Sequence, residues 1–315
     1  MSPDGAGAAV GLRFTGDGLP GLNDYPGHEL PAVAVERTDV GALDERWAEV
    51  ATPELIFERP FRDGRPFLRV ERDERAGYRV SAVEHGTHVV SPDGAKCASA
   101  LPDGPPWRAM KLLASQTLPL LATLRGREVL HAAGIVIAGR LIAIVAASGT
   151  GKSATTCNLI AQGGRFFADD VLAMEVADGH VLAHPGTRLL NVLAHDLEAI
   201  PEPGRARLGE RLGESDKVHF VPQGFSGPLP VRGLLFLRRG QEVADTGLGT
   251  LENASSQLLG NAFLPYLDSA ARLAGQLEVM SALAQTVPLA QLEIAAGDGP
   301  PAVATIAREW AERLP

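Results

Sequence analysis

Short β-forming segments dominate the first third of the chain. From about residue 53 to 100, PFLRVER, GYRVSAVE and THVVSP are bounded by Gly, Pro and Asp, which predicts strands of a small antiparallel sheet. Residues 1 to about 50 are rich in Gly, Pro and Asp and show weak periodicity, so we expect a partly mobile start. The pattern predicts a β-rich N-terminal region, residues 1–105, followed by a second domain, residues 106–315.

The second domain is predicted to open with a helix and a hairpin. WRAMKLLASQTLPLLATLRG has apolar residues at helical spacing and ends on Gly126, a residue typical of a helix C-terminus. Pro119 inside it predicts a kink or a break. EVLHAAGIVIA and RLIAIVAA are apolar, β-rich runs that meet at Gly139 and Arg140, which predicts a tight hairpin.

Strands and helices then alternate to the end of the chain. A helix is expected over KSATTCNLIAQ, and RFFADDVLAMEV is expected to pair with HVLAHPG, with two adjacent aspartates inside the first strand. VRGLLFLRRG predicts a buried strand, and residues 201–230 predict a long surface loop. Helices over 252–260 and 264–286, a strand LAQLEI and a helix from about 301 complete the pattern, which is that of an α/β domain with a helical tail.

Composition narrows the class of protein. The chain of 315 residues is 45% hydrophobic and 21% charged, which is typical of globular proteins. Its formal net charge of −9 argues against a surface built to bind nucleic acid. There are 2 cysteines, no membrane-length apolar run, and neither a basic start nor an apolar stretch in MSPDGAGAAVG. We therefore expect a cytoplasmic protein with no membrane partner.

The stretch AASGTGKSATT, residues 146–156, carries most of the phosphate-loop pattern G-x-x-x-x-G-K-[ST]. In that pattern backbone N–H groups surround phosphate oxygens, the lysine reaches the β- and γ-phosphates, and the hydroxyl coordinates Mg²⁺. Ala146 replaces the first glycine at a strand end, where a small residue is tolerated. An ordinary glycine turn is the structural alternative, but the strand–loop–helix context favours phosphate binding. The expected nucleotide-binding residues are Ser148, Gly149, Thr150, Gly151, Lys152, Ser153 and Ala154.

Acidic residues follow the loop at about one helix length. Asp169 and Asp170, together with Ser153, are the expected metal ligands, and one of the two carboxylates could take the proton of an acceptor hydroxyl. A solvated, turn-forming pair is the alternative, and it would be preferred if the loop were absent. His131, in VLHAAG, taken alone is more simply a core histidine.

These motifs occur in the order found in a known family. LHAAGIVIAGRLIAIVAASGTGKSATTCNLIAQGGRFFADDVLAMEV resembles the kinase core of HPr kinase/phosphorylase and its smaller relatives: a strand histidine, a hairpin, an SGxGKS loop, a helix ending in glycine and an ADD strand. The preceding helix and LRGREVLHA resemble the HPr-kinase-like kinases of bacterial peptide-modification clusters, including the lasso-peptide kinases. AHPGTRLLN, SDKVHF and the helical tail extend the likeness more loosely over most of residues 70–315.

The resemblance implies a P-loop kinase core of the HPr kinase and phosphoenolpyruvate carboxykinase type. It also implies use of ATP and Mg²⁺ and transfer of the γ-phosphate to a serine-type hydroxyl, above all one on a ribosomally made precursor peptide. Gly149 to Ser153 would hold the triphosphate and metal, and His131 would lie beside the transferring phosphate. Asp169 and Asp170 would be metal ligand and general base, in an order that the sequence does not decide.

Two basic residues are weaker candidates for the site. Arg188 and Lys217 could neutralise charge on the transferring phosphoryl group, and a solvated surface role suits each equally well. HPr kinases carry a further signature, E-[IV]-R-G-x-G, after the aspartates. The nearest string here, Arg232-Gly233-Leu234-Leu235, lacks the acid and the second glycine, which argues against HPr itself as the acceptor.

Other functions stay open at the level of sequence. The acceptor could be a small-molecule hydroxyl, such as free serine or a sugar, rather than a peptide or small protein. The chain could also be a nucleotide-binding regulatory module without catalysis, although the paired aspartates and the histidine disfavour this. A decarboxylase is disfavoured because the chain is short and has no recognisable oxaloacetate site. HPr kinases are hexameric, so a homo-oligomer stays open.

Overall fold

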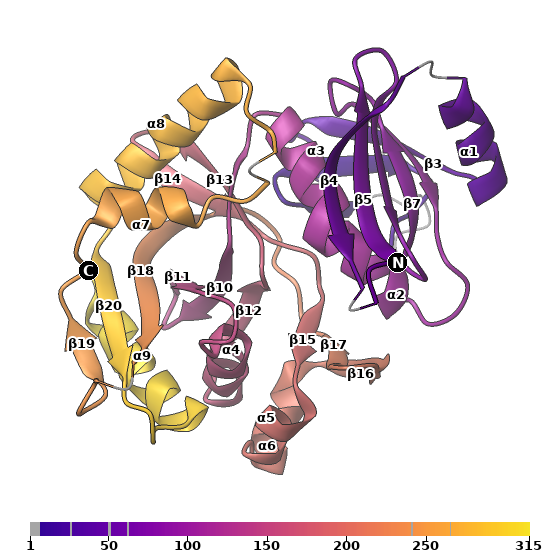
Figure 1. Ribbon diagram of the computed structural model, residues 1–315. Coiled ribbons are helices and arrows are strands. Elements are labelled where there is room, and N and C mark those ends of the chain that lie inside the picture. Colours follow the sequence, from indigo (N-terminus) through magenta and orange to yellow (C-terminus); the bar gives the residue numbers. More distant parts are fainter. Residues whose placement is uncertain (1–6, 26, 50–51, 62, 241, 265) are drawn as a thin grey trace.

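The computed structural model has two sheet-based lobes joined by a helical segment (Figure 1). An eight-stranded sheet forms the N-terminal lobe, and a nine-stranded sheet with helices forms the core lobe. A three-stranded sheet extends the core lobe beneath the junction of the two (Figure 1). The structure describes residues 7–25, 27–49, 52–61, 63–240, 242–264 and 266–315.

The N-terminal lobe confirms the antiparallel sheet expected for residues 53–100. Its strands lie in the order β1-β2-β3-β8-β7-β6-β5-β4, with β3 parallel to both of its neighbours. Their bounds are β1 (Gly7–Ala9), β2 (Leu12–Gly16), β3 (Ala32–Arg37), β4 (Glu54–Pro60), β5 (Pro66–Asp73), β6 (Gly77–Ala82), β7 (Gly86–Val90) and β8 (Lys96–Ala100).

The start of the chain is more regular than its composition suggested. Residues 7–48 form β1 to β3 and helix α1 (Val40–Ala48), which Asp39 caps through a hydrogen bond from Ala42 N at 2.9 Å. The strands are too short to show a clear period, but Leu12 and Phe14 alternate into the core as a half-buried strand requires. Residues 1–6, part of the segment expected to be mobile, lie outside the described residues.

The helical segment between the lobes becomes irregular, without breaking, next to the proline that predicted a kink or a break. Helix α2 (Trp107–Leu112) runs into a π-helical turn (Leu113–Thr117) and then into α3 (Leu118–Leu124), whose first turn contains Pro119. Proline has no N–H to donate to the preceding turn, so the irregular backbone lies just ahead of it. Such π-helical turns are common at functional sites.

The core lobe confirms the α/β class. Its strands are β9 (Glu128–Leu130), β10 (Ala132–Ile137), β11 (Arg140–Ala146), β12 (Arg165–Ala168), β13 (Leu172–Ala177), β14 (His180–His184), β18 (Leu229–Arg239), β19 (Gly247–Gly249) and β20 (Leu289–Ile294). The order is β12-β10-β11-β18-β14-β13-β9, and β20 pairs with β18 on one side and β19 on the other. The predicted hairpin is confirmed between β10 and β11, with φ of +48° at Ala138 and +80° at Gly139.

Helices cover both faces of this sheet (Figure 1). Helices α4 (Lys152–Ala161) and α9 (Pro300–Arg313) pack on the face that carries Ile135 and Ile144. Helices α7 (Ala254–Gly260) and α8 (Ala270–Thr286) pack on the opposite face. Because both faces are buried, β10 and β11 consist of nearly continuous apolar runs. Among the described helices, none combines the length and apolar character that crossing a membrane requires.

The prediction of a long surface loop over residues 201–230 is wrong. This region contains α6 (Glu202–Arg205), a 3₁₀ turn (Ala206–Leu208), β16 (Glu210–Glu214) and β17 (Val218–Val221). The two strands pair with each other, and β17 also pairs with β15 (Leu190–Val192), which α5 (Ala194–Glu198) follows. Val218 and Phe220 are buried in the core lobe, so tertiary packing outweighs the Pro- and Gly-rich composition.

Candidate phosphoryl-transfer site

The predicted histidine and aspartates lie at matching breaks in two strand pairs. Strand β10 pairs with β12, and the strands next to them in the chain, β9 and β13, also pair. His131 lies between β9 and β10, and Asp169–Val171 lies between β12 and β13, so the single strand expected over RFFADDVLAMEV is in fact two. Asp170 has a left-handed φ of +61°, and Val171 N donates to Asp169 O at 2.8 Å. Because of this turn, the two aspartates lie outside the paired strands.

The phosphate loop connects β11 to α4, as the sequence predicted. Ala146, the last residue of β11, is buried, so the missing glycine falls within the strand rather than in the loop. Gly149 and Gly151 have φ of +82° and +108°, and a Cβ on either would meet nothing within 4 Å. The backbone here is an open cradle, and the first N–H groups of α4 beside it have no intrahelical acceptor.

Lys152 connects the loop to the acidic residues. Its side chain is 7% exposed and forms an ion pair with Asp170. A buried ammonium needs such a partner, because the loss of hydration is otherwise uncompensated. Burial acts to raise the pKa of Asp170, but attraction and hydrogen bonding by Lys152 outweigh it and hold that pKa below its usual range. Asp170 is therefore ionised at neutral pH.

Asp169 has a different environment. Its Oδ2 accepts a hydrogen bond from Asn191 N at 3.3 Å, whereas its buried Oδ1 has no partner among the described residues. Burial, followed by repulsion from Asp170, raises the pKa of Asp169 to about 7. A carboxyl group with a pKa near neutrality is suited to accept a proton. The free oxygen is also one that a metal ion or an acceptor hydroxyl could satisfy.

The apo protein should therefore lose stability as Asp169 ionises. The pKa of Asp169 is higher in the folded than in the unfolded chain, so folding binds protons and is opposed as pH rises from about 4 to about 7. We expect Asp169→Asn to be more stable than the wild type at pH 8 by about 1 kcal/mol or more, and to match it near pH 4. Urea unfolding at both pH values measures this. A difference that does not change with pH would contradict the buried-charge account.

His131 packs against a segment that precedes α8. Its ring stacks on Phe263 with centroids 5.8 Å apart, and its backbone N–H donates to Asn261 O at 2.8 Å. Burial, and then the nearby Lys152, lower the pKa of His131, so the imidazole is neutral at pH 7. Its Nδ1 is buried without a partner among the described residues. The ring therefore has an unused polar atom beside the acidic pair.

A buried ion pair holds Phe263 in place. Arg272, on α8, donates from Nη2 to Phe263 O at 2.9 Å, and lies 3.4 Å from Glu128 on β9. The two side chains are 9% and 3% exposed, and burial, opposed by Arg272, raises the pKa of Glu128 to about 7. No sequence motif indicated this arrangement, since its members lie 144 residues apart.

Removing the arginine should therefore destabilise the fold. We expect Arg272→Met to lower the free energy of unfolding by about 3 kcal/mol at pH 8, because the buried Glu128 must then either stay ionised without a partner or take up a proton. The double variant Arg272→Met/Glu128→Gln should recover most of that loss. As a control, Arg238→Met breaks an exposed pair with Glu293 and should cost less than about 1 kcal/mol. Denaturant titration of the wild type, these three variants and the single variant Glu128→Gln tests the coupling, and additive losses would contradict it.

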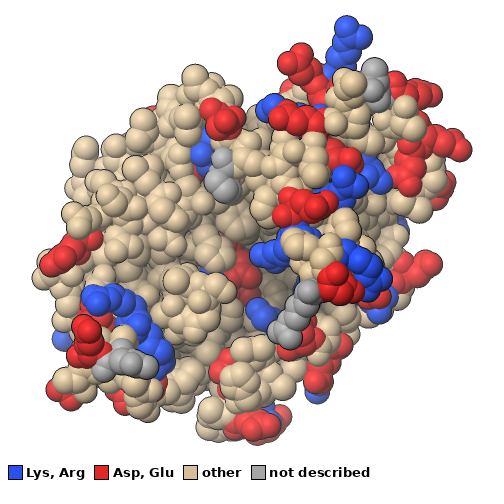
Figure 2. Space-filling view, in the orientation of Figure 1, with Lys and Arg blue, Asp and Glu red and all other residues tan. Residues whose placement is uncertain are grey.

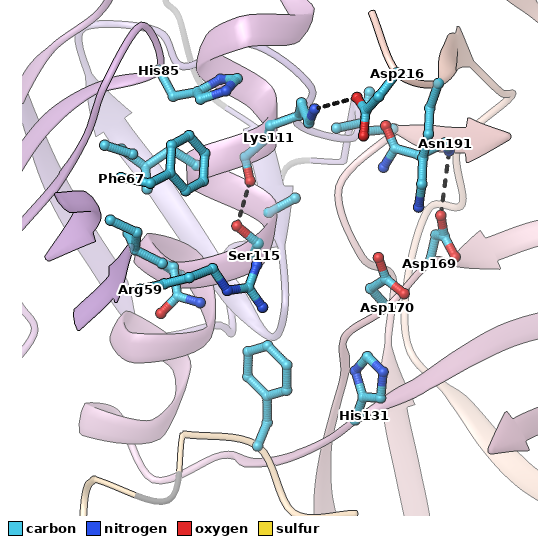
Figure 3. A pocket seen from close by; sticks show the side chains of 18 residues that line it. Arg59, Phe67, His85, Lys111, Ser115, His131, Asp169, Asp170, Asn191 and Asp216 are labelled. Atoms are coloured by element: carbon cyan, nitrogen blue, oxygen red, sulfur yellow. Dashed lines mark hydrogen bonds and ion pairs between the residues drawn. The ribbon is translucent and has the colours of Figure 1, made fainter. Parts of the chain in front are cut away.

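The acidic pair and the histidine form the floor of a cavity of about 380 Å³ (Figure 3). The N-terminal lobe contributes Arg59, Phe67 and His85 to the side opposite the aspartates, and the segment formed by α2 and the π-helical turn contributes Lys111 and Ser115. Asp216, which forms an ion pair with Lys111 at 3.3 Å, and Lys217 lie on the side of β16 and β17. Figure 2 shows a hollow at the junction of the lobes, with acidic and basic side chains around it.

Asn191 is a site residue that the sequence did not reveal. It lines the cavity, and its side-chain Oδ1 is hydrogen-bonded to His219 Nδ1 at 2.8 Å. His219 is fully buried, stacks on Trp107 at 4.3 Å and contacts Ser215 Oγ at 3.0 Å through Nε2. These contacts fix the ring of His219, which in turn holds the side chain of Asn191. The backbone N–H of Asn191 donates to Asp169 Oδ2.

The two weaker basic candidates, Lys217 and Arg188, lie beside different cavities. Lys217 lines the cavity and lowers the pKa of both aspartates, so it faces them. Arg188 is not brought to the cluster. Its Nε donates to Pro222 O at 3.0 Å and its backbone N–H to Gly21 O at 2.8 Å, which holds it beside a different cavity. The chain after β14 is extended, and it directs the side chain of Arg188 toward the N-terminal residues. This position corrects the expected role of Arg188 at the transferring phosphoryl group.

The predicted magnesium ligands fit the ion's preferences. Within the described part of the chain no group of three or more His, Cys, Asp and Glu side chains could hold a metal on its own. Mg²⁺ in nucleotide sites takes only one or two carboxylates and completes its shell with water and phosphate oxygens. Ser153, at the start of α4, and the two carboxylates supply that minimal oxygen set, and Asp169 Oδ1 is free to be a ligand.

Among the comparisons with known proteins, only the search of solved structures finds matches, and the match described here is distant. No family model matches the chain, and no curated protein does. Among solved structures, it is similar to the Hpr(Ser) kinase/phosphatase from Coxiella burnetii, with 12% sequence identity over 58% of this chain and 95% of that chain. The TM-score of 0.31 is too low to support an assignment of fold or function, so the proposal below rests on the site itself.

Proposed function

We propose that this protein is an ATP- and Mg²⁺-dependent kinase that transfers the γ-phosphate to a hydroxyl group. The observation that carries the proposal is the ion pair between Lys152 and Asp170. It connects a phosphate-binding loop directly to an acidic pair at the floor of a cavity large enough for an acceptor. A simple phosphate-binding turn would need neither the second aspartate nor the cavity.

Each residue has a role that its environment favours. The loop N–H groups and Lys152 bind the triphosphate. Asp169, with its pKa near 7, takes the proton of the attacking hydroxyl as the new oxygen–phosphorus bond forms and the bond to ADP breaks. Mg²⁺, when held by Ser153 and the ionised Asp170, would neutralise charge on the phosphates. His131, neutral with Nδ1 unused, is placed to hydrogen-bond a phosphoryl oxygen.

The acceptor that we propose first is a serine hydroxyl on a peptide. A second candidate, a small hydroxyl compound, is favoured by the volume of the cavity, about 380 Å³, which is in the range of small-ligand sites. Incubation with Mg²⁺·ATP and a panel of serine peptides, free serine and sugars, followed by mass spectrometry, distinguishes them. The product should gain one phosphate group, and binding of ATP without transfer to any hydroxyl would favour a regulatory role instead.

A further inference from the structure

The cavity lies on the acceptor side of the acidic pair. None of the phosphate-loop residues from Ser148 to Ser153 lines it, whereas both aspartates and His131 do. Lys152 reaches Asp170 from the loop side, so the acidic pair separates the loop from the cavity. A phosphate donor bound by the loop and an acceptor bound in the cavity would then meet at Asp169 and Asp170. In-line transfer requires this placement of the two reactants.

Most charged groups of the cavity already have partners, but Arg59 does not. Lys111 forms an ion pair with Asp216, Lys152 with Asp170, and Lys217 faces the two aspartates. Arg59, near the end of β4, has no ion-pair or side-chain hydrogen-bond partner among the described residues. Figure 3 shows its guanidinium directed into the cavity, below Ser115 and opposite Asp170.

The surroundings of Arg59 limit what it could bind. Phe67 and Phe263 give the cavity apolar surface, and the acidic pair would repel a second anion placed beside it. Arg59 is contributed by the N-terminal lobe, across the cavity from the aspartates. A compound that spans the cavity can therefore place a hydroxyl at Asp169 and an anionic oxygen group at Arg59. Guanidinium binds carboxylate or phosphate oxygens in two parallel hydrogen bonds.

We infer that this cavity binds the phosphoryl acceptor, and that Arg59 from the N-terminal lobe binds an anionic group, carboxylate or phosphate, on that acceptor. The inference rests on the proposed kinase function, because it assigns the hydroxyl to Asp169. It gives the N-terminal lobe a function, which is to complete the acceptor site. The transfer itself is balanced: the hydroxyl oxygen bonds to the γ-phosphorus, ADP leaves, and the hydroxyl proton moves to Asp169.

Matched pairs of acceptors test the inference with the full-length protein and Mg²⁺·ATP. The pairs are L-serine and L-serinamide, glycerol 3-phosphate and glycerol, and end-blocked Ser-Asp and Ser-Asn peptides. We expect the anionic member of at least one pair to have a kcat/KM about 10- to 100-fold higher, as a charge-assisted hydrogen bond would give. The pair that shows this preference identifies the source of the anionic group.

Variants of Arg59 test whether this residue causes the preference for the anionic acceptor. Arg59→Gln should raise the KM for the anionic acceptor and leave the KM for ATP unchanged. The ratio of kcat/KM between the anionic and the neutral acceptor should then fall close to one. Arg59→Lys should recover part of the wild-type ratio. The control Arg65→Gln changes a 77% exposed arginine that pairs with Asp63, and should keep the wild-type ratio.

The outcomes separate this inference from the proposed function. Equal transfer to both members of each pair, or a preference that survives in Arg59→Gln, overturns the role of Arg59 and leaves the kinase proposal intact. Failure of the wild type to phosphorylate any of the six compounds, while it still binds Mg²⁺·ATP, overturns both.

Discussion

Replacing Lys152 by methionine is expected to lower the rate of phosphoryl transfer by roughly 10³-fold, the effect typical of removing a preorganised charge from a developing phosphoryl charge. Methionine keeps most of the buried aliphatic length, so α4 should still form. The change removes the cation that reaches the phosphates and also the partner of Asp170, whose pKa should rise. Initial rates of ADP formation in the presence of acceptor measure the loss.

A lysine outside the site provides the control for this variant. Lys96 begins β8, is exposed and lies in the N-terminal lobe, so Lys96→Met should keep the wild-type rate. Circular dichroism and urea unfolding should show that both variants fold. If folded Lys152→Met turned over ATP at the wild-type rate, the loop would not hold the reacting phosphate.

Neutralising either aspartate should strongly reduce the rate of transfer while ATP binding survives. Asp169→Asn removes the proposed proton acceptor, and Asp170→Asn removes the proposed metal ligand, so each should cost roughly 10²- to 10⁴-fold in kcat. Asparagine tolerates the left-handed φ of +61° at Asp170, so the turn should persist. The two variants should differ in metal dependence, since only Asp170→Asn should need a higher Mg²⁺ concentration for half-maximal activity.

A second turn in the same sheet offers a matched control. Asp178 lies in the exposed β13–β14 turn with φ of +49°, so Asp178→Asn makes the same chemical change in the same backbone conformation. It should leave both activity and metal dependence unchanged. Full activity in Asp169→Asn would remove that residue from the chemistry, and equal Mg²⁺ requirements in the two site variants would contradict the division of roles.

Local patterns in the sequence predicted the elements around the site. The run into Ala146, the glycines after it and the helix from Lys152 form a strand–loop–helix unit whose signals lie within a few residues. The same holds for the hairpin at Gly139 and for the helical irregularity near Pro119. The sequence did not predict that one break at His131 and another at Asp169–Val171 would coincide across paired strands, because pairing register is a tertiary property.

The acceptor side of the site was not predictable from local patterns. Arg59 and Phe67 come from strands with ordinary exposed or half-buried alternation, and only the packing of the two lobes brings them to the aspartates. The β16–β17 hairpin was hidden by its Pro, Gly and charged neighbours, although it supplies Lys217. The predicted position of Arg188 was wrong, because the direction of a side chain on an extended segment depends on the tertiary contacts that it makes. Here that contact is with Pro222 O.

The central claim is that the loop, the acidic pair and the cavity together transfer phosphate to a hydroxyl. The most direct measurement follows the fate of γ-labelled ATP, incubated with Mg²⁺ and the acceptor panel, in the wild type and in Asp169→Asn. The account predicts that the label appears in an acceptor with the wild type, and that Asp169→Asn binds ATP but leaves the label in it. Label that stays in ATP with the wild type, or that reaches the acceptor equally fast with Asp169→Asn, would contradict the account.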